Sequence, residues 1–335
     1  MNLPADHPPV PAPKIGVLVM NLGTPDAPDA KAVRRYLGEF LSDRRVVEIP
    51  ALAWQPILRG IILNTRPKKS AHAYAQVWTD DGSPLAAVTR AQATALKDAF
   101  GPTVLVDWAM RYGKPAIAER LQAMKDAGCE RILLAPLYPQ YCAATTATAN
   151  DKAFAHLAKQ RWQPAIRTLP PYYDDPRYID ALKESVERGL ADLDFVPEVL
   201  IASFHGMPKR TLALGDPYHC HCQKTARLLS EALGKPVTIA FQSRFGPQKW
   251  LGPATDTTLE DLARSGTKRV AIFAPGFSAD CLETLEELAI RGRESFTGAG
   301  GSHFAYIPCL NDSETGIRML RRIIGTELEG WVKPL

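Results

Sequence analysis

The chain has 335 residues, of which 46% are hydrophobic and 23% are charged, a composition typical of a globular protein. This length exceeds what one ordinary hydrophobic core supports, so two domains are expected. The formal net charge of +4, without a basic stripe or a block of like charges, argues against nucleic acid as a partner.

The two ends of the chain and its cysteines indicate where the protein works. Residues 1–13 are rich in proline and lack the apolar region of a signal peptide, so we expect a disordered leader there. The most apolar segment, residues 51–63, is interrupted by Pro56 and Gly60 and is too short to span a membrane. Six scattered cysteines fit reduced thiols better than a disulfide framework. We therefore expect a cytoplasmic protein.

The first half of the chain alternates short apolar segments with helical patterns. Strands are predicted at residues 14–20, 104–110 and 131–135. Helices are predicted at residues 30–41 and 116–127, the second ended by a glycine. This alternation is typical of parallel βαβ units.

The second half repeats the landmarks of the first in the same order. Strands are predicted at residues 199–204, 237–241 and 269–274, with a helix at residues 259–264. In both halves the strands lead into Gly-x-Pro, Arg-aromatic-Gly and Ala-Pro motifs in succession. Three matches in one order predict an internal duplication.

The duplication predicts an α/β fold of two similar Rossmann-like domains with parallel sheets and a cleft between them. Open α/β sheets bind ligands beyond the carboxyl ends of their strands, so the site is expected in that cleft. We assign residues 14–172 to the N-terminal domain and residues 173–308 to the C-terminal domain. Residues 309–335 are expected to form a helix that packs back on the first domain.

Positions where the two halves differ are the better candidates for chemistry. His205 follows a predicted strand directly and corresponds to Leu22 in the first half. A histidine at this edge suits a general base or a metal ligand, and equally suits a hydrogen-bonded turn residue. The residues alone leave these two interpretations open.

A row of acids follows the last predicted strand of the duplication. Asp280, Glu283 and Glu287 lie three and four residues apart, which places them on one face of a helix. Such a row could bind a divalent cation or carry protons away. Acids in a first helical turn also suit the helix macrodipole, and spacing alone favours this second explanation.

Other familiar motifs are weak or missing in the sequence. Cys220 and Cys222, interleaved with His219 and His221, could bind a metal, but no second thiol pair has zinc-site spacing. There is no Gly-x-Gly-x-x-Gly, Walker A or Gly-x-Ser-x-Gly motif. The sequence therefore disfavours a nucleotide-dependent enzyme.

Several segments together resemble the bacterial ferrochelatase family. They are VLVMNLGTPDAPDAKAVRRYLGEFLSDRRVVEIP (17–50), AMRYG (109–113), LAPLYPQYCAATT (134–146), SFHGMPKRTLALGDPY (203–218), FQSRFGPQKWLGPATD (241–256) and PGFSADCLETLEEL (275–288). The resemblance implies a lyase that inserts Fe²⁺ into protoporphyrin IX and releases two protons, the last step of haem biosynthesis. It implies Fe²⁺ as a substrate and no required cofactor. Three alternatives stay open: a chelatase for coproporphyrin III, a chelatase for a corrinoid precursor, and a non-catalytic haem or metal carrier.

The resemblance also assigns roles to residues of this chain. The implied catalytic residues are His205, Glu283 and Asp280, and the implied iron-binding residues are His205, Glu283 and Glu287. The implied porphyrin-binding residues are Arg111, Tyr112, Trp250 and Ser83.

Two departures from the family pattern change what is expected. Arg291 stands where many relatives continue the acidic row, which weakens the case for an outer cation site. The last cysteine is Cys309, and Cys142 falls one position short of a cluster cysteine of the family. We therefore expect no [2Fe–2S] cluster.

Residues 51–69 combine an apolar segment with a basic flank. They could form an ordinary amphipathic helix. They could instead form an apolar lip of the cleft that contacts the inner membrane peripherally.

Overall fold

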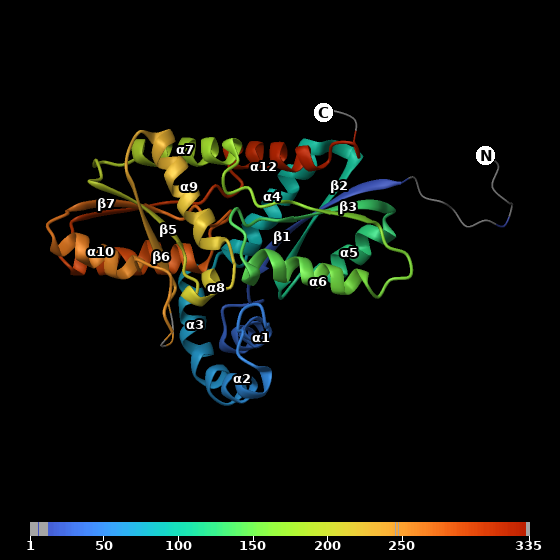
Figure 1. Ribbon diagram of the computed structural model, residues 1–335, viewed down its shortest axis with the longest axis horizontal. Helices are drawn as coiled ribbons and strands as arrows, with labels where there is room; N and C mark the ends of the chain where they lie inside the picture. Colours follow the sequence, from blue (N-terminus) through green and yellow to red (C-terminus); the bar gives the residue numbers. More distant parts are fainter. Residues whose placement is uncertain (1–5, 7–12, 245, 247, 333–335) are drawn as a thin grey trace.

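The computed structural model describes residue 6, residues 13–244, residue 246 and residues 248–332. Apart from Asp6 and Pro13, the expected leader at residues 1–13 lies outside the described residues. Two parallel sheets lie side by side, and helices cover both of their faces (Figure 1).

The first half forms a four-stranded parallel sheet in the order β2-β1-β3-β4. Its strands are β1 (Lys14–Gly23), β2 (Val104–Tyr112), β3 (Cys129–Pro136) and β4 (Ala165–Thr168). Because helices cover both faces, the central strand β1 is a nearly continuous apolar run with most of its side chains buried.

The second half forms a sheet of the same topology, in the order β6-β5-β7-β8. Its strands are β5 (Val199–His205), β6 (Val237–Gln242), β7 (Arg269–Phe273) and β8 (His303–Ile307). The backbone N–H of Met110 donates to the carbonyl of Pro115, and Phe241 donates to Pro253 in the equivalent place. The internal duplication and the α/β fold class are confirmed.

Helices connect the strands and contain three π-helical segments. The α-helices are α1 (Ala30–Leu41), α2 (Ala51–Ile57), α3 (Leu63–Val77), α4 (Pro84–Phe100), α5 (Ile117–Asp126), α6 (Thr148–Leu157), α7 (Pro176–Ala191), α8 (Lys209–Ala213), α9 (Tyr218–Leu233), α10 (Thr255–Arg264), α11 (Arg293–Gly298) and α12 (Glu314–Glu327). A 3₁₀ turn, η2 (Gly101–Thr103), follows α4, and the π-helical segments are η1 (Leu58–Ile62), η3 (Ala143–Ala147) and η4 (Glu283–Gly292). The segments η3 and η4 follow equivalent strands, so the duplication extends to this rare conformation.

One large hydrophobic cluster joins the two halves. It contains Val17 and Leu133 from the first sheet, Phe204 and Ala271 from the second, and Leu320 from α12. Helix α12 packs against both α7 and α4. The domain boundary at residues 172 and 173 stays a prediction, because the apolar core runs across it.

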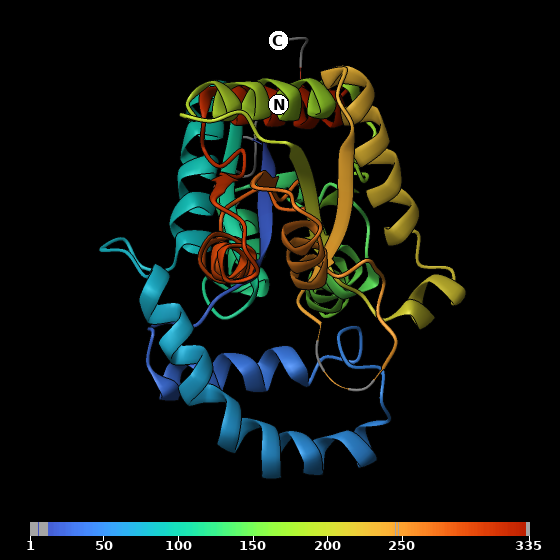
Figure 2. The same ribbon diagram turned by 90° about the vertical axis from the view of Figure 1, so that its left-hand side faces the viewer.

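Helices α1, α2 and α3 project from one end of the two-sheet body (Figure 2). Strand β1 ends at Gly23 and α1 begins at Ala30, so this is the end where the carboxyl termini of the parallel strands lie. Tyr74 of α3 packs against Val33 of α1 in a small apolar cluster. Leu282, which immediately precedes η4, packs against the same cluster.

Candidate active site

His205 is the last residue of β5, and its Cα is paired in register with that of Gln242 on β6. The side chain is partly buried. Its Nδ1 lies 2.7 Å from the carbonyl oxygen of Gly206. Because a carbonyl only accepts hydrogen bonds, Nδ1 carries the ring proton and Nε2 presents its lone pair. The turn thus selects the tautomer that can take up a proton or bind a metal ion.

A glycine is required next to this histidine. The N–H of Gly206 donates to the carbonyl of Gln242 over 2.7 Å. A Cβ at Gly206 would lie 2.5 Å from that oxygen and 3.4 Å from the Trp250 ring. Trp250 reaches this turn through an antiparallel bridge to Pro208. Trp250 therefore lies beside the histidine turn, and its contact with a porphyrin stays a prediction.

Gln242 connects the histidine strand to the acidic segment. Its side chain is 2% exposed, and its Oε1 accepts from the Ser203 hydroxyl over 2.7 Å. Its Nε2 donates to the carbonyl of Glu283 over 3.1 Å. Sequence reasoning missed this residue, although a polar side chain at the carboxyl end of a buried strand was a signal for it.

Glu283 is the first residue of η4, and η4 contacts helix α3 of the projection. Burial chiefly, followed by the neighbouring charges of Tyr74 and Glu283, raises the pKa of Tyr36 well above its ordinary value. Burial and then Glu283 raise the pKa of Tyr74 in the same way. The charge of Glu283 thus acts on two buried phenols of the first half. Gln242 contacts the segments of both residues: it is the register partner of His205, and its side chain donates to the backbone carbonyl of Glu283.

Asp280 does not join Glu283 on one helical face. The helix begins after Asp280, and its carboxylate is only 6% exposed. Oδ1 accepts from the Tyr306 hydroxyl over 2.6 Å and from Thr284 over 2.9 Å, while Oδ2 accepts from Asn311 over 2.6 Å. The prediction of one shared face is wrong, because spacing assumed a regular helix that already included Asp280.

Glu287 is also held by a neighbour. Its Oε1 accepts from the backbone N–H of Ser243 over 2.7 Å, and its Oε2 accepts from the Ser243 hydroxyl over 2.5 Å. Arg291 pairs with Glu286, with 3.0 Å between Nε and Oε1. Within the described ranges, no group of three His, Cys, Asp or Glu side chains is arranged to hold a metal ion. The structure therefore does not bring Glu287 together with His205 and Glu283 as a three-ligand set.

Arg111 and Tyr112 converge on one partly buried carboxylate. The Arg111 guanidinium pairs with Asp43, and the Tyr112 hydroxyl donates to Asp43 over 2.8 Å. Burial raises the pKa of Asp43, but hydrogen bonds from Thr148, from the Arg45 backbone and from Tyr112 outweigh it, so the pKa lies below its ordinary value.

The two residues differ in exposure at this carboxylate. Tyr112 is 0% exposed. The Tyr112 hydroxyl is held by Asp43, and its contact with a porphyrin stays a prediction. The Arg111 side chain keeps 11% exposure.

Ser83 lies at the start of α4 and is buried, with 4% exposure. Its hydroxyl accepts from the Thr24 hydroxyl over 2.8 Å. Thr24 directly follows Gly23, which has a φ of +120°. A Cβ at position 23 would lie 2.0 Å from the Tyr112 carbonyl oxygen. The structure thus brings Ser83 close to the carboxyl ends of β1 and β2.

The Cys/His segment of α9 is built into the contact between the halves. All six cysteines are free, and Cys222 is buried whereas Cys220 is exposed. His221 accepts at Nδ1 from the backbone N–H of Tyr141 over 3.2 Å. Its ring stacks on Tyr173 with 3.6 Å between centroids. These contacts account for His221 without a metal ion.

We expect His221 to make stability depend on pH. Burial lowers its pKa below the ordinary value, with Asp174 and Asp216 opposing and Lys224 adding to the shift. Because the folded-state pKa lies below the unfolded value of about 6.5, the unfolded chain takes up the proton first as pH falls. The stability is therefore fully present above about pH 6.5 and is lost as pH falls through the folded-state pKa. Urea unfolding between about pH 7 and pH 5 should show this decline. The slope should become shallower in His221→Phe, which keeps the stacking, and an unchanged slope would assign the decline to other groups.

Comparisons with known proteins agree along the whole chain. Residues 14–328 match the protein family described as Ferrochelatase. A protein named Ferrochelatase from Rhizobium meliloti (strain 1021) is 58% identical, and the alignment covers 99% of this chain and 100% of that protein. A Ferrochelatase from Agrobacterium fabrum (strain C58 / ATCC 33970) is also 58% identical, with 98% of each chain covered.

A solved structure shares the fold at much lower identity. The structure described as SirB from Bacillus subtilis with Fe³⁺ has a TM-score of 0.55 and 12% identity, covering 93% of this chain and 94% of that one. At such identity the likeness supports the two-sheet architecture alone. The family match and the full-length relatives settle the assignment: the chain belongs to the ferrochelatase family.

Proposed function

We propose that this chain inserts Fe²⁺ into protoporphyrin IX to form protohaem, as the last step of haem biosynthesis. The observation that carries the proposal is full-length membership of the ferrochelatase family with a histidine at the end of β5. In the reaction two pyrrole N–H bonds break and the four ring nitrogens bind the metal. The divalent charge of the iron replaces the two protons, which leave separately.

His205 accepts a pyrrole proton through Nε2 in this proposal. Its Nδ1–H is held by the Gly206 carbonyl, so the basic nitrogen keeps one orientation. Glu283, whose backbone carbonyl accepts from Gln242, is the second acceptor and the carboxylate that binds Fe²⁺. One imidazole and one carboxylate make a sparse N/O site, which suits an ion that must be surrendered to the ring.

The remaining predicted residues either contact the porphyrin or support residues that do. We propose that Trp250 contacts the face of the ring beside the Gly206 turn and that Arg111 and Ser83 lie toward its carboxylates. Tyr112 and Asp43 support Arg111 from behind. Asp280 holds the start of η4 through Thr284 and ties it to β8 through Tyr306, and it does not touch the substrate.

Anaerobic turnover of purified protein with Fe²⁺ and protoporphyrin IX tests the proposal. We expect catalytic loss of porphyrin fluorescence over many turnovers. Coproporphyrin III is run in parallel. Conversion of coproporphyrin III alone would assign the chain to a related chelatase, and tight binding of protoporphyrin without turnover would make it a carrier.

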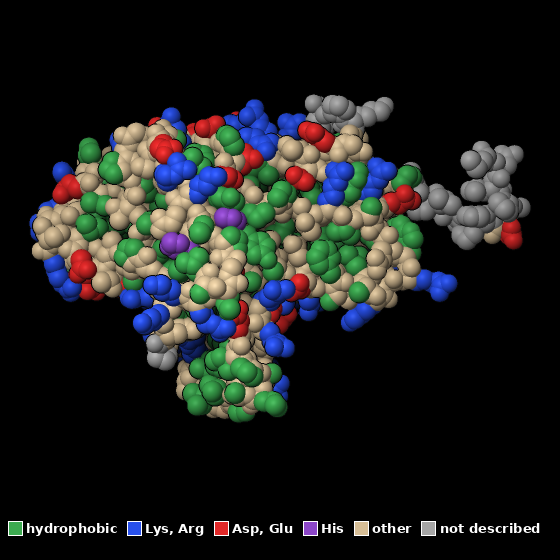
Figure 3. All heavy atoms as spheres, in the orientation of Figure 1, with side chains coloured by type: hydrophobic (Ala, Val, Ile, Leu, Met, Phe, Trp, Pro, Cys, Tyr) green, Lys and Arg blue, Asp and Glu red, His purple; other side chains and the backbone are tan. Residues whose placement is uncertain are grey.

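The projecting helices carry an exposed apolar surface, which we call the apolar lip. It consists of Leu52, Ile57 and Ile61, which are 94%, 41% and 57% exposed. Figure 3 shows hydrophobic side chains gathered at the tip of this projection. Lys68 and Lys69 are exposed on the adjoining helix α3. Within the described ranges, no helix has the length and hydropathy to cross a bilayer.

We propose that the apolar lip rests on the cytoplasmic face of a membrane and gives access to an apolar porphyrin. Removing one large aliphatic side chain from water contributes about 1.5–3 kcal/mol. The double variant Leu52→Glu with Ile61→Glu should therefore lose at least about tenfold in affinity for anionic vesicles in a flotation assay. Val196→Glu, at an exposed apolar residue away from the lip, is the control. Equal binding of all three proteins would refute contact through the lip.

A further inference from the structure

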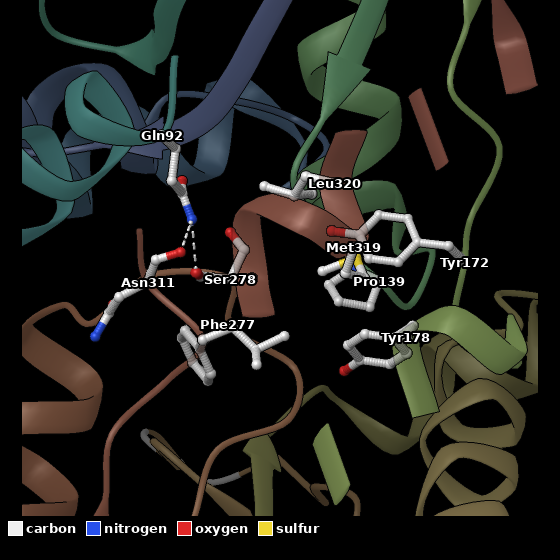
Figure 4. Close-up of a pocket in the computed structure, with 11 residues that line it drawn as sticks. Gln92, Pro139, Tyr172, Tyr178, Phe277, Ser278, Asn311, Met319 and Leu320 are labelled. Carbon is white, nitrogen blue, oxygen red and sulfur yellow. Dashed lines mark hydrogen bonds between the residues drawn. The ribbon is translucent and has the colours of Figure 1, made fainter. Parts of the chain in front are cut away.

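A buried glutamine of the first half reaches into the second half. Gln92 lies on α4 and is 0% exposed. Its Nε2 donates to the carbonyl of Ser278 and to the carbonyl of Asn311, both over 2.9 Å. Figure 4 shows both bonds leaving the same amide nitrogen. Both of its amide hydrogens are therefore used to join segments that are far away in sequence.

The two carbonyls belong to the unit that holds Asp280. The Asp280 N–H donates to the Asn311 side-chain oxygen over 2.8 Å, and the Asn311 amide donates to Oδ2 of Asp280 over 2.6 Å. Asn311 has a φ of +50°, a left-handed conformation that surrounding contacts must maintain in a residue other than glycine. Ser278 lies two residues before Asp280 and Glu283 three after it, so Gln92 ties α4 to the support of the acidic segment.

A small cavity lies next to the hydrogen bonds that Gln92 makes to Ser278 and Asn311, which we call the Gln92 clamp. Its volume is about 10 Å³, and Gln92, Ser278 and Tyr172 are among the residues that line it. The Gln92 Oε1, the Ser278 hydroxyl and the Tyr172 hydroxyl are buried and have no hydrogen-bond partner among the described residues. The cavity has room for about one water molecule, which needs two to four polar partners. Three unpaired polar atoms around such a space are what an enclosed water would satisfy.

We propose that Gln92 is a positioning residue for iron insertion. It holds the Ser278 and Asn311 backbones against α4, assisted by one enclosed water, and so sets where η4 presents Glu283. Gln92 itself touches neither substrate. The expected effect on kcat rests on the proposed function. The expected effect on the backbone of residues 278–288 rests on the hydrogen bonds alone.

Substitution by methionine removes both hydrogen bonds at nearly constant volume. We expect Gln92→Met to lower kcat by about tenfold to a hundredfold, because small displacements of a reacting group have costs of that size. The KM for the porphyrin should stay unchanged. Amide hydrogen exchange at residues 278–288 should become faster in the variant, measured without iron or porphyrin.

A glutamate at the same position gives a signature that loss of stability alone does not produce. In Gln92→Glu an ionised carboxylate would face two carbonyl oxygens, whereas the protonated acid donates to one of them. We therefore expect the ratio of variant to wild-type kcat to rise as pH is lowered. If Gln92→Met does not fold, this pH profile decides the proposal. A ratio independent of pH would overturn it.

Leu96→Ala is the matched control, since Leu96 lies one turn further along α4 and is 0% exposed in the core. It should lower Tm while leaving kcat and exchange at residues 278–288 as in wild type. Equal losses of kcat in both variants, or wild-type kcat and exchange in Gln92→Met, would overturn the inference.

Two further readouts keep the inference separate from the proposed function. Turnover by the wild-type protein tests the proposed function. Amide hydrogen exchange at residues 278–288 tests the Gln92 clamp whether or not the protein turns over. In a crystal structure we expect one ordered water bonded to Ser278 and Tyr172. A dry cavity would overturn the part assigned to the water.

Discussion

Replacement of His205 by alanine is expected to lower kcat for iron insertion by about 10²- to 10⁴-fold, the range of a lost general base. Porphyrin binding, followed by fluorescence, should stay as in wild type, because the ring is held mainly by other residues. The size of the effect follows from the fixed tautomer. The Gly206 carbonyl holds the proton on Nδ1, so Nε2 is the basic nitrogen at the end of β5.

A matched histidine distinguishes this effect from a general loss of imidazole. His303 is exposed and begins β8, which places it at the amino end of the second sheet. His303→Ala should keep wild-type kcat and Tm. Near-normal turnover in His205→Ala would remove this side chain from the proton transfer and leave Glu283 as the first acceptor.

The two-sheet architecture could be predicted from the sequence because the strands of the duplication are strongly apolar. The six predicted strands are present, and the two sheets have the same strand order. The strands β4 and β8 were missed. They are only 4 and 5 residues long, and no repeated turn motif marks them. Short strands with partly exposed residues carry little periodic signal.

The site was predictable where a residue's place in the chain decides its neighbours. His205 lies at a strand end, so its position follows from the sheet. Asp280 was misplaced because its contacts are made by Tyr306 and Asn311, which come later in the chain. The burial of Tyr112 against Asp43 and the reach of Gln92 across the interface are long-range contacts of the same kind.

Substitutions at Asp280 and Glu283 are expected to have different effects, the first on the free energy of unfolding and the second on kcat. Asp280→Asn replaces a buried acceptor of three side-chain hydrogen bonds and opposes one amide to another at Asn311. Hydrogen bonds to a charged group contribute about 1.5–3 kcal/mol each, so the free energy of unfolding should fall by about 3 kcal/mol or more. Guanidinium chloride unfolding measures this change.

Glu283→Gln should show the opposite pattern. Its side chain is only partly buried, so the free energy of unfolding should change by less than about 1 kcal/mol. The kcat should fall by about 10²-fold or more, because an amide cannot accept the proton or balance the charge of Fe²⁺. Unchanged stability together with an equal loss of kcat in Asp280→Asn would instead make Asp280 a catalytic residue. The two carboxylates lie three positions apart, so the contrast between them tests whether their hydrogen bonds, rather than their spacing, determine their roles.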